Sequence, residues 1–357
     1  MSSNSKRTTN NKHLIVDHVL EYIWIGGNNE YRSKFRYITR INICDQDLLE
    51  KLVWNYDGSS TGQATVLESE VILKPIRVFK NPIYDFENKI SFIVICETMQ
   101  QNGEPTKTNH RKIANDIFNA DIDADPWFGL EQEYFIIDPK TELPLGYDAS
   151  KTQGQFYCSI GAENSFGRTI SEEHFKACIE CAINISGMNA EAAPGQWEFQ
   201  IGPSEGIEAG DHLMIARYLL IKIAEKHSMK ISFEPKPIKG SNWNGSGCHA
   251  NYSTVNMREG KGKHNGLFYI NKGIKLLAEK HDEHMAVYGE GNEERMTGEN
   301  ETSSFNKFTS GIGDRTASVR IGNETYKNKC GYFEDRRPSS NCDPYLVTSY
   351  IFKNANV

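Results

Sequence analysis

The sequence predicts a two-domain α+β protein built largely on an antiparallel sheet, and three observations lead to this prediction. The chain has 357 residues, more than one hydrophobic core usually supports. Most segments with a regular apolar pattern alternate with period two, as strands do, while helical periodicity is confined to a few. A polar stretch containing Gly103 and Pro105 interrupts the pattern and places a domain boundary near residue 105.

The predicted elements follow from local residue preferences. Runs rich in β-branched and aromatic residues predict strands at 20–25, 35–43, 90–97, 127–137, 195–201, 230–233, 247–254, 317–321 and 331–335. Helices are predicted at 110–119, 172–186 and 212–227. Ser171 and Asp211 have the side chains expected of N-caps for the last two helices. A segment with Gly and Pro, residues 139–154, is expected to be a loop.

The composition excludes several classes of protein. Hydrophobic residues make up 38% and charged residues 24%, which is typical of a globular chain and not of a disordered or collagenous one. The net charge of −7 argues against a nucleic-acid partner, because such proteins usually present basic patches to phosphate. Residues 1–12 are polar, and no apolar run is long enough to span a membrane. We therefore expect a cytoplasmic protein with no membrane partner.

The eight cysteines are too scattered to form a disulfide framework, so we expect them to be reduced. Cys178 and Cys181 have the C-x-x-C spacing of a redox or zinc site, but no second pair matches it. Because the surrounding segment is predicted to be helical, we interpret them as two buried thiols one turn apart.

The informative feature is where carboxylates fall on the predicted strands. Side chains alternate between the two faces of a strand, so Glu131 and Glu133 share one face of the strand 127–137. In the strand 195–201, Glu198 lies on the polar face, opposite an apolar face. In the predicted strand 247–254, His249, Asn251 and Ser253 share a face. At the predicted strand 331–335 the same alternation groups Tyr332 and Glu334 with Arg336.

Each of these strands, taken alone, is more often a solvated polar face than part of a metal site. Several carboxylates packed into one sheet are costly, however, unless a cation compensates them. Oxygen ligands with one imidazole suit Mg²⁺ or Mn²⁺. A lone histidine more often has a structural role than a metal-binding one. His249 shares its face with Asn251 and Ser253, which makes a metal site as plausible as a structural role.

Arginines accumulate toward the end of the chain, as phosphoryl transfer beside divalent cations requires. They are Arg295, Arg315, Arg320, Arg336 and Arg337. Arg315 and Arg320 are separated by an odd number of residues, so we place Arg315 in the turn before a strand and not within it. For Arg337 we favour an exposed, solubilising role.

Motifs of other nucleotide-binding and hydrolytic enzymes do not occur. The sequence contains no G-x-x-x-x-G-K-[ST], G-x-G-x-x-G, G-x-S-x-G or H-E-x-x-H. The residues alone therefore predict an ATP-using, Mg²⁺-dependent enzyme built on an antiparallel sheet.

Over about residues 21–344, nearly the whole chain, the sequence resembles glutamine synthetase, specifically the shorter eukaryote-like class called type II. The segments that carry the resemblance are residues 54–61, 127–134, 189–191, 196–202, 242–245, 247–249, 297–303, 331–337 and 341–344. The resemblance implies a flexible segment at 1–17, an N-terminal β-grasp domain at 18–105, and a catalytic domain at 106–357. The catalytic domain would contain a curved antiparallel sheet flanked by helices.

The resemblance also implies the ligands of the site. Matching positions for one divalent cation are Glu133, Glu191 and Glu198, and for a second they are Glu131, His249 and Glu334. About two or three Mg²⁺ or Mn²⁺ ions are expected per site. Glutamate would be bound by Asn242, Trp243, Asn244, Gly245, Arg295, Arg315 and Arg336. ATP would be bound as a substrate by Asn251, Ser253, Arg320 and Tyr332.

The implied reaction joins ammonia to glutamate through γ-glutamyl phosphate. Arg315 would stabilise the transferring phosphoryl group. Asp57 matches the residue that takes a proton from ammonium, and Glu301 the flap carboxylate that excludes water. Without the resemblance, Asp57 is an ordinary turn residue before glycine and serine.

Three positions depart from the family pattern. Gly26-Gly27 replaces Asp-Gly, Asn300 replaces the histidine that commonly precedes the flap glutamate, and Asp314 replaces the asparagine before Arg315. The first puts a family turn in doubt. The other two affect flap closure or ammonium affinity, and none removes a named catalytic group.

Two other functions compete with ammonia ligation. A γ-glutamyl ligase of the same fold would use another amine, although intact Asp57 and Glu301 favour ammonium. A non-catalytic structural relative would be expected to lack metal ligands, and all six candidates are present. Family members form stacked rings, a decamer by the resemblance, in which each active site lies between two subunits.

Overall fold

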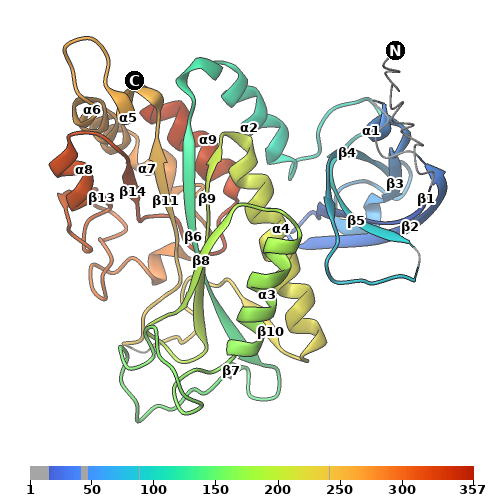
Figure 1. Cartoon of the computed structure of the whole chain (residues 1–357), viewed down its shortest axis with the longest axis horizontal. Helices are drawn as coiled ribbons and strands as arrows, with labels where there is room; N and C mark the ends of the chain where they lie inside the picture. The colour runs from blue at the N-terminus through green and yellow to red at the C-terminus, as the bar shows by residue number, and fades with distance from the viewer. Residues whose placement is uncertain (1–15, 42–46, 88, 241) are drawn as a thin grey trace, which may run out of the picture. The chain divides into compact units, whose positions relative to one another are not determined.

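Figure 1 shows the computed structural model of the chain, which describes residues 16–41, 47–87, 89–240 and 242–357. Almost all of the predicted N-terminal segment 1–17, and the end of the predicted strand 35–43, lie outside the described residues. The chain divides into two compact units, Met1–Thr108 and Asn109–Val357. Each is described below by itself.

The first unit contains a five-stranded sheet in the order β2-β1-β5-β4-β3. Its elements are β1 (Val16–Ile25), β2 (Tyr31–Ile41), α1 (Leu48–Lys51), β3 (Trp54–Asp57), the 3-10 turn η1 (Gly58–Thr61), β4 (Glu70–Lys80) and β5 (Ile90–Met99). β1 and β5 run parallel, and the other neighbours are antiparallel.

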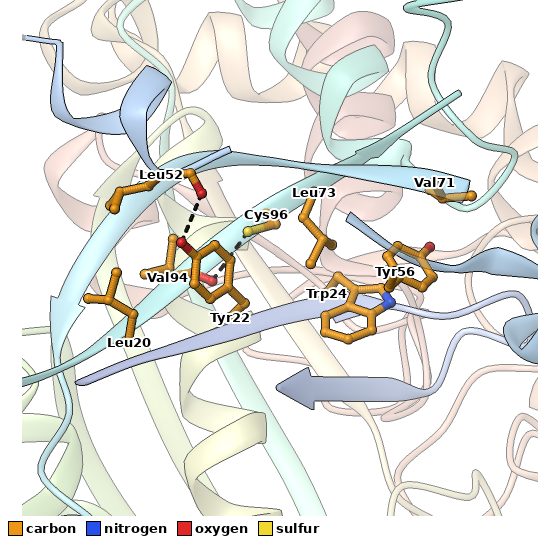
Figure 2. Packing of buried hydrophobic residues seen from close by; sticks show 9 residues of the cluster. All are labelled: Leu20, Tyr22, Trp24, Leu52, Tyr56, Val71, Leu73, Val94 and Cys96. Atoms are coloured by element: carbon orange, nitrogen blue, oxygen red, sulfur yellow. Dashed lines mark hydrogen bonds between the residues drawn. The ribbon is translucent and has the colours of Figure 1, made fainter. Parts of the chain in front are cut away.

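Alternate residues of these strands form the core of the first unit. Figure 2 shows Leu20, Tyr22 and Trp24 of β1 against residues of β3, β4 and β5. The hydroxyl of Tyr22 donates a hydrogen bond of 2.8 Å to the carbonyl of Leu52, just after α1. Leu20, Tyr22 and Trp24 share one face of β1, and the alternate residues Val19, Glu21 and Ile23 are buried as well, on its other face.

The second unit contains a nine-stranded sheet, whose main path is β12-β13-β14-β11-β6-β9-β8. Its strands are β6 (Trp127–Asp138), β7 (Leu143–Pro144), β8 (Ile185–Ala190), β9 (Gln196–Glu205), β10 (Lys230–Ser232), β11 (Cys248–Ser253), β12 (Ser310–Ile312), β13 (Val319–Ile321) and β14 (Phe333–Asp335). β7 and β10 both pair with β6. The pairs are antiparallel except for β12 with β13.

The helical elements of the second unit complete its architecture. They are α2 (His110–Asn119), η2 (Ile122–Ala124), α3 (Arg168–Glu180), α4 (Ile207–Lys226), α5 (Val255–Glu259), α6 (Gly266–Glu279), α7 (His281–Met285), η3 (Asn292–Glu294), α8 (Asn323–Asn328) and α9 (Pro344–Ala355). In Figure 1, α3, α4 and α9 lie beside the sheet. The predicted α+β class, with a curved antiparallel sheet flanked by helices, is confirmed.

The helices cover one face of the sheet and leave the other open to solvent and ligands. On β6 the buried side chains Phe128, Leu130, Gln132 and Tyr134 alternate with half-buried ones. Gln132 accepts a hydrogen bond of 2.7 Å from Arg217 of α4, so the helices lie on this face. Glu131 and Glu133 consequently point to the opposite face.

The predicted starts of two helices are wrong. α3 begins at Arg168 after Gly167, and α4 begins at Ile207 after Gly206; both glycines have positive φ. Ser171 lies inside α3, where its hydroxyl accepts from Tyr134 at 2.9 Å. Asp211 is buried in α4 and accepts from Arg111 at 2.7 Å. Tertiary hydrogen bonds, and not capping, account for these polar residues.

The segment after α3 also differs from its predicted helix. The helix ends at Glu180, Ala182 has φ +59°, and the chain then enters β8. The seven cysteines in the described residues are free thiols, and Cys178 and Cys181 are both buried as expected. The elements β3, β4, β7, β8, β12, α1 and α5 to α9 were not predicted from the sequence.

The surface role predicted for Arg337 is wrong. Its side chain is fully buried and forms an ion pair of 2.7 Å with buried Asp335 of β14. The hydroxyl of Tyr288 donates to the same carboxylate at 2.8 Å, and His281 lies 3.1 Å from the guanidinium. We refer to Asp335, Arg337, Tyr288 and His281 as the buried Asp335 network.

Candidate active site

Strand register brings the predicted ligands onto one face of the larger sheet. Directly opposed residues share a face, and His249 of β11 pairs with Glu131 of β6. Glu133 of β6 likewise pairs with Glu198 of β9. On the other side of β11, Asn251 pairs with Glu334 of β14. Four strands therefore supply one polar surface.

Three of these side chains form a compact group. One ligand atom from each of Glu131, His249 and Glu334 lies within 4.8 Å of the others. The Nδ1 atom of His249 is 3.4 Å from both carboxylates. Burial alone would raise the pKa of Glu131, but hydrogen bonds from His249 and Asn251 lower it to about 2. Its ionised form is therefore the one that this group stabilises.

A second group consists of three glutamates, Glu133, Glu191 and Glu198. Burial, followed by repulsion from Glu191, raises the pKa of Glu133 to about 7. Burial raises the pKa of Glu191 to about 7 as well. The pKa of Glu198 rises to about 9 because of burial and the charge of Glu133. Without a counter-ion these carboxylates cannot all be ionised at neutral pH.

The chemistry of these donors fits divalent cations. Carboxylate oxygens and one imidazole are suitable ligands for Mg²⁺ or Mn²⁺. The raised pKa values indicate negative charge that the surrounding protein does not compensate. A bound cation would replace the protons and restore the ionised forms.

Five of these six side chains, all except the buried Glu334, line one cavity of about 460 Å³, together with Asn244, Gly245 and Glu301. Its positively charged lining residues are Arg295, Arg315, Arg320 and Arg336. The same cavity therefore contains both carboxylates and guanidinium groups, a combination suited to an anionic ligand held beside cations.

A second cavity of about 480 Å³ adjoins the first through Glu131, which lines both. Asn251, Ser253 and Tyr332, which were predicted to bind ATP, line this second cavity. Trp127 and Arg258 contribute an aromatic ring and a guanidinium stacked over it, 4.1 Å from the ring centre. The fourth predicted ATP residue, Arg320, lies in the first cavity.

Comparison with known proteins agrees with this geometry. Residues 107–285 match a family described as glutamine synthetase, catalytic domain. A glutamine synthetase cytosolic isozyme of Medicago sativa is 50% identical over 339 residues, 93% of this chain and 92% of the relative. The chain belongs to the glutamine synthetase family. The predicted resemblance to the eukaryote-like class is confirmed.

Two other relatives of this chain extend the comparison. A protein of Acanthamoeba polyphaga mimivirus, named provisionally as a glutamine synthetase, is 49% identical over 354 residues, 99% of this chain and 98% of the relative. The chloroplastic glutamine synthetase of Brassica napus is 50% identical over 339 residues, 93% of this chain and 77% of the relative. Within the described part of this chain, no helix is long and apolar enough to cross a membrane.

The arginines of the cavity differ in how closely they contact carboxylates and in how exposed they are. Arg336 donates to Glu334 at 2.7 Å, and Arg320 lies 2.5 Å from the other oxygen of Glu334. Arg315 lies in the turn between β12 and β13, as predicted, and is 3.8 Å from Glu301. Arg315 is also the most accessible of these, with 59% of its side chain exposed.

The turn predicted to bind glutamate is supported from behind. Trp243 is buried in an apolar cluster with Phe156, so its ring holds the turn in place and does not line the cavity. Arg295 is also buried, and its Nη2 atom donates to the carbonyls of Arg337 at 2.7 Å and Arg336 at 3.1 Å. Burial lowers the pKa of Arg295 to about 10.

Asp57 belongs to the first unit, at the end of β3. Its carboxylate accepts from the hydroxyls of Ser59 at 2.6 Å and Ser60 at 2.8 Å. These hydrogen bonds lower the pKa of Asp57, so the exposed carboxylate is ionised at neutral pH. Such a group is suited to attracting a cation such as ammonium.

The sequence analysis missed several residues of the site. Gln153 donates to Asn300 and accepts from the backbone of Asn244. Gln196, which is two residues from Glu198 on the same face of β9, donates to the carbonyl of Gly245 at 2.9 Å. For Gln196 the alternation of β9 was a usable signal, whereas Gln153 lies in an irregular loop without one.

Two of the family departures have a local explanation. A Cβ atom at Gly26 would lie 2.3 Å from the carboxylate of Glu30, which accepts from the backbone of Asn28 at 2.9 Å. Glu30 thus fills the space where the family has an aspartate side chain. Asp314 accepts from the backbone and hydroxyl of Thr316, which lowers the pKa of Asp314 and orders the turn.

The raised pKa values predict a pH effect on metal-free protein. Unfolded glutamates titrate near 4.5, so between about pH 5 and 9 the folded state holds more protons than the unfolded chain. The stability of metal-free protein is therefore expected to fall as the pH rises across this range. Thermal unfolding after chelation would measure it, and saturating Mg²⁺ should flatten the slope. A metal-free Tm that rises between pH 6 and 9 would contradict the assignment.

Proposed function

We propose that this protein joins ammonia to L-glutamate with the consumption of ATP, giving L-glutamine, ADP and phosphate. The observation that carries the proposal is a single cavity lined by Glu131, Glu133 and Glu198 together with four arginines. Membership of the glutamine synthetase family supports the same reaction. The protein is thus a glutamate-ammonia ligase of glutamine biosynthesis.

The cation sites would be formed by the two carboxylate groups. Glu133, Glu191 and Glu198 would hold one cation, and Glu131, His249 and Glu334 another. Bound Mg²⁺ or Mn²⁺, about two or three ions per site, supplies positive charge that offsets the charge of phosphate oxygens. The protein ligands fix the positions of that charge.

The substrates would occupy the two adjoining cavities. Asn251, Ser253 and Tyr332 are proposed to hold the nucleoside part of ATP, with Tyr332 beside the adenine. Arg320 would contact the phosphates, because it lies in the cation cavity. Glutamate would be bound by the turn of Asn242, Asn244 and Gly245, which buried Trp243 supports from the side away from the cavity, and by Arg295, Arg315 and Arg336.

The reaction proceeds in two transfers. A γ-carboxylate oxygen of glutamate attacks the terminal phosphorus of ATP, the bond to the bridging oxygen breaks, and ADP leaves. Arg315 would stabilise the charge on the transferring group. Ammonia then attacks the acyl carbon of γ-glutamyl phosphate, and phosphate leaves with its electron pair. Asp57 would take the proton from ammonium, while Glu301 closes the cavity against water.

The direct test is a coupled phosphate-release assay. With glutamate, ATP, Mg²⁺ and ammonium, phosphate and glutamine should form in equal amounts. Release that requires a bulkier amine would identify a γ-glutamyl ligase instead. Absence of any Mg²⁺-dependent ATP turnover in assembled protein would favour a non-catalytic structural relative.

We further propose that each active site is shared between subunits of stacked rings, a decamer by family resemblance, in the cytoplasm. The domain at 18–105 would supply Asp57 to a site formed by the domain at 106–357 of a neighbour. A fully active monomer in light scattering would contradict this arrangement.

Sharing predicts that two inactive variants complement each other. Asp57→Ala and Glu133→Ala proteins should each be inactive. After co-expression in equal amounts, about a quarter of shared sites would contain both intact residues, so about a quarter of the activity should return. Co-expressed variants without activity would place Asp57 and Glu133 in the same subunit's site.

A further inference from the structure

A short loop carries the flap glutamate across the mouth of the cavity. Residues 298–303 form this flap loop, and an antiparallel bridge between Thr297 and Ser304 closes its base. Asn300 and Glu301 have φ of +50° and +62°, a left-handed conformation that is uncommon for residues with a Cβ atom. Two consecutive residues in this region are expected to persist only where other contacts hold them.

Side-chain amides hold the flap loop to the opposite wall of the cavity. Asn300 accepts a hydrogen bond of 3.3 Å from Nε2 of Gln153 and donates one of 3.2 Å to Oδ1 of Asn242. Oε1 of Gln153 accepts from the backbone N–H of Asn244 at 2.7 Å. That bond fixes which end of the Gln153 amide faces Asn300, so Asn300 must accept there and donate on its other side.

Glu301 is held from a different direction. Arg336 donates to its carbonyl at 3.2 Å, and Arg315 lies 3.8 Å from its carboxylate. Both arginines belong to the sheet side of the cavity, whereas Gln153 and Asn242 belong to the loops across from it. Among the described residues, the bonds of Asn300 are the side-chain hydrogen bonds that join the flap loop to those loops.

We propose that Asn300 is a positioning residue that latches the flap loop and so controls whether ammonia or water reaches the acyl phosphate. The proposal rests on the proposed function and concerns a position where this chain departs from its family pattern. An open flap admits water, whose oxygen attacks the acyl carbon; phosphate leaves and glutamate is regenerated. The net reaction is then ATP hydrolysis without glutamine.

The first test compares Asn300→Ala with Asn306→Ala. Asn306 is exposed, lies in the segment just after the flap loop, and has no side-chain hydrogen bond in the described structure, so its replacement makes the same chemical change without breaking the latch. At limiting ammonium, wild type and Asn306→Ala should release one phosphate per glutamine. Asn300→Ala should release several phosphates per glutamine. An unchanged ratio with a lower kcat would mean a merely structural role and would overturn the proposal.

The second test does not depend on activity. A glutamate-specific protease can cut after Glu299 or Glu301 only when the flap loop opens. Cleavage of Asn300→Ala should be about 25-fold faster than that of wild type, because two hydrogen bonds are lost and each contributes a factor of about five. Asn306→Ala should be cut at the wild-type rate. Equal cleavage of all three proteins would overturn the latch.

A double variant tests the partner. If Gln153 acts through Asn300, adding Gln153→Ala to Asn300→Ala should change the cleavage rate and phosphate ratio little beyond the single variant. Multiplying effects would overturn the proposed pairing. A wild type that forms no glutamine would refute the proposed function, and the cleavage rates would still decide whether Asn300 latches the loop.

Discussion

Replacing Glu133 with alanine is expected to lower kcat by about a thousandfold or more, because one cation loses a carboxylate that faces the reacting phosphate. The same change should leave the fold intact. Glu133 contributes to the raised pKa of Glu198, so its removal relieves repulsion between buried carboxylates. Metal-free Glu133→Ala protein should therefore melt at or above the wild-type temperature.

Activity in the coupled assay and thermal unfolding of the same preparation would check both parts. Glu205→Ala is the matched control, since Glu205 is an exposed glutamate at the end of β9, the strand that pairs with β6. It should retain wild-type activity. Substantial turnover by Glu133→Ala with Mg²⁺ would exclude Glu133 as a ligand, and a large loss of stability would mean that its role is structural.

The second large effect concerns stability. Arg337→Ala removes the cation from the buried Asp335 network and leaves an uncompensated carboxylate, which typically costs about 3–5 kcal/mol. Burial alone would raise the pKa of Asp335, and the Arg337 guanidinium lowers it instead. The ionised Asp335 therefore adds to the free energy of unfolding above the pKa of an unfolded aspartate, and this stabilisation is lost as the pH falls.

Denaturant unfolding at neutral pH would measure the loss. In Asp335→Ala/Arg337→Ala protein both charges are absent, so its destabilisation should be smaller than the sum of the two single effects. Strict additivity would show that the ion pair contributes no coupling energy. Arg320→Ala is a comparison at a partly exposed arginine, and a smaller effect is expected there.

Strand periodicity predicted much of the site. Alternation alone placed Glu131 with Glu133, and His249 with Asn251, on common faces. Alternation does not say which strands are neighbours, so the union of these faces into one surface required the register of β6, β9, β11 and β14. Asp57 was recognised through family resemblance, because an aspartate before Gly58 is also a common turn residue.

The errors have a shared physical cause. Local residue preferences predicted helix caps at Ser171 and Asp211 and a surface position for Arg337. Ser171 and Asp211 instead bond to residues distant in the sequence, Tyr134 and Arg111. Arg337 forms its ion pair with Asp335 inside the folded core. Asn300 shows the same limit within the site. Its partner Gln153 is 147 positions away, which no local pattern reveals.

Two adjacent residues of the three-residue strand β14 point to opposite sides of the sheet. Glu334 lies beside His249, and Asp335 belongs to the buried Asp335 network. A one-residue slip during folding would exchange them and would bring Arg336 into the core in place of Arg337. In such a misfolded pairing the charged side chains on both faces of β14 would lose their native partners. The buried ion pair between Asp335 and Arg337 therefore penalises incorrect pairing of the strand that carries Glu334.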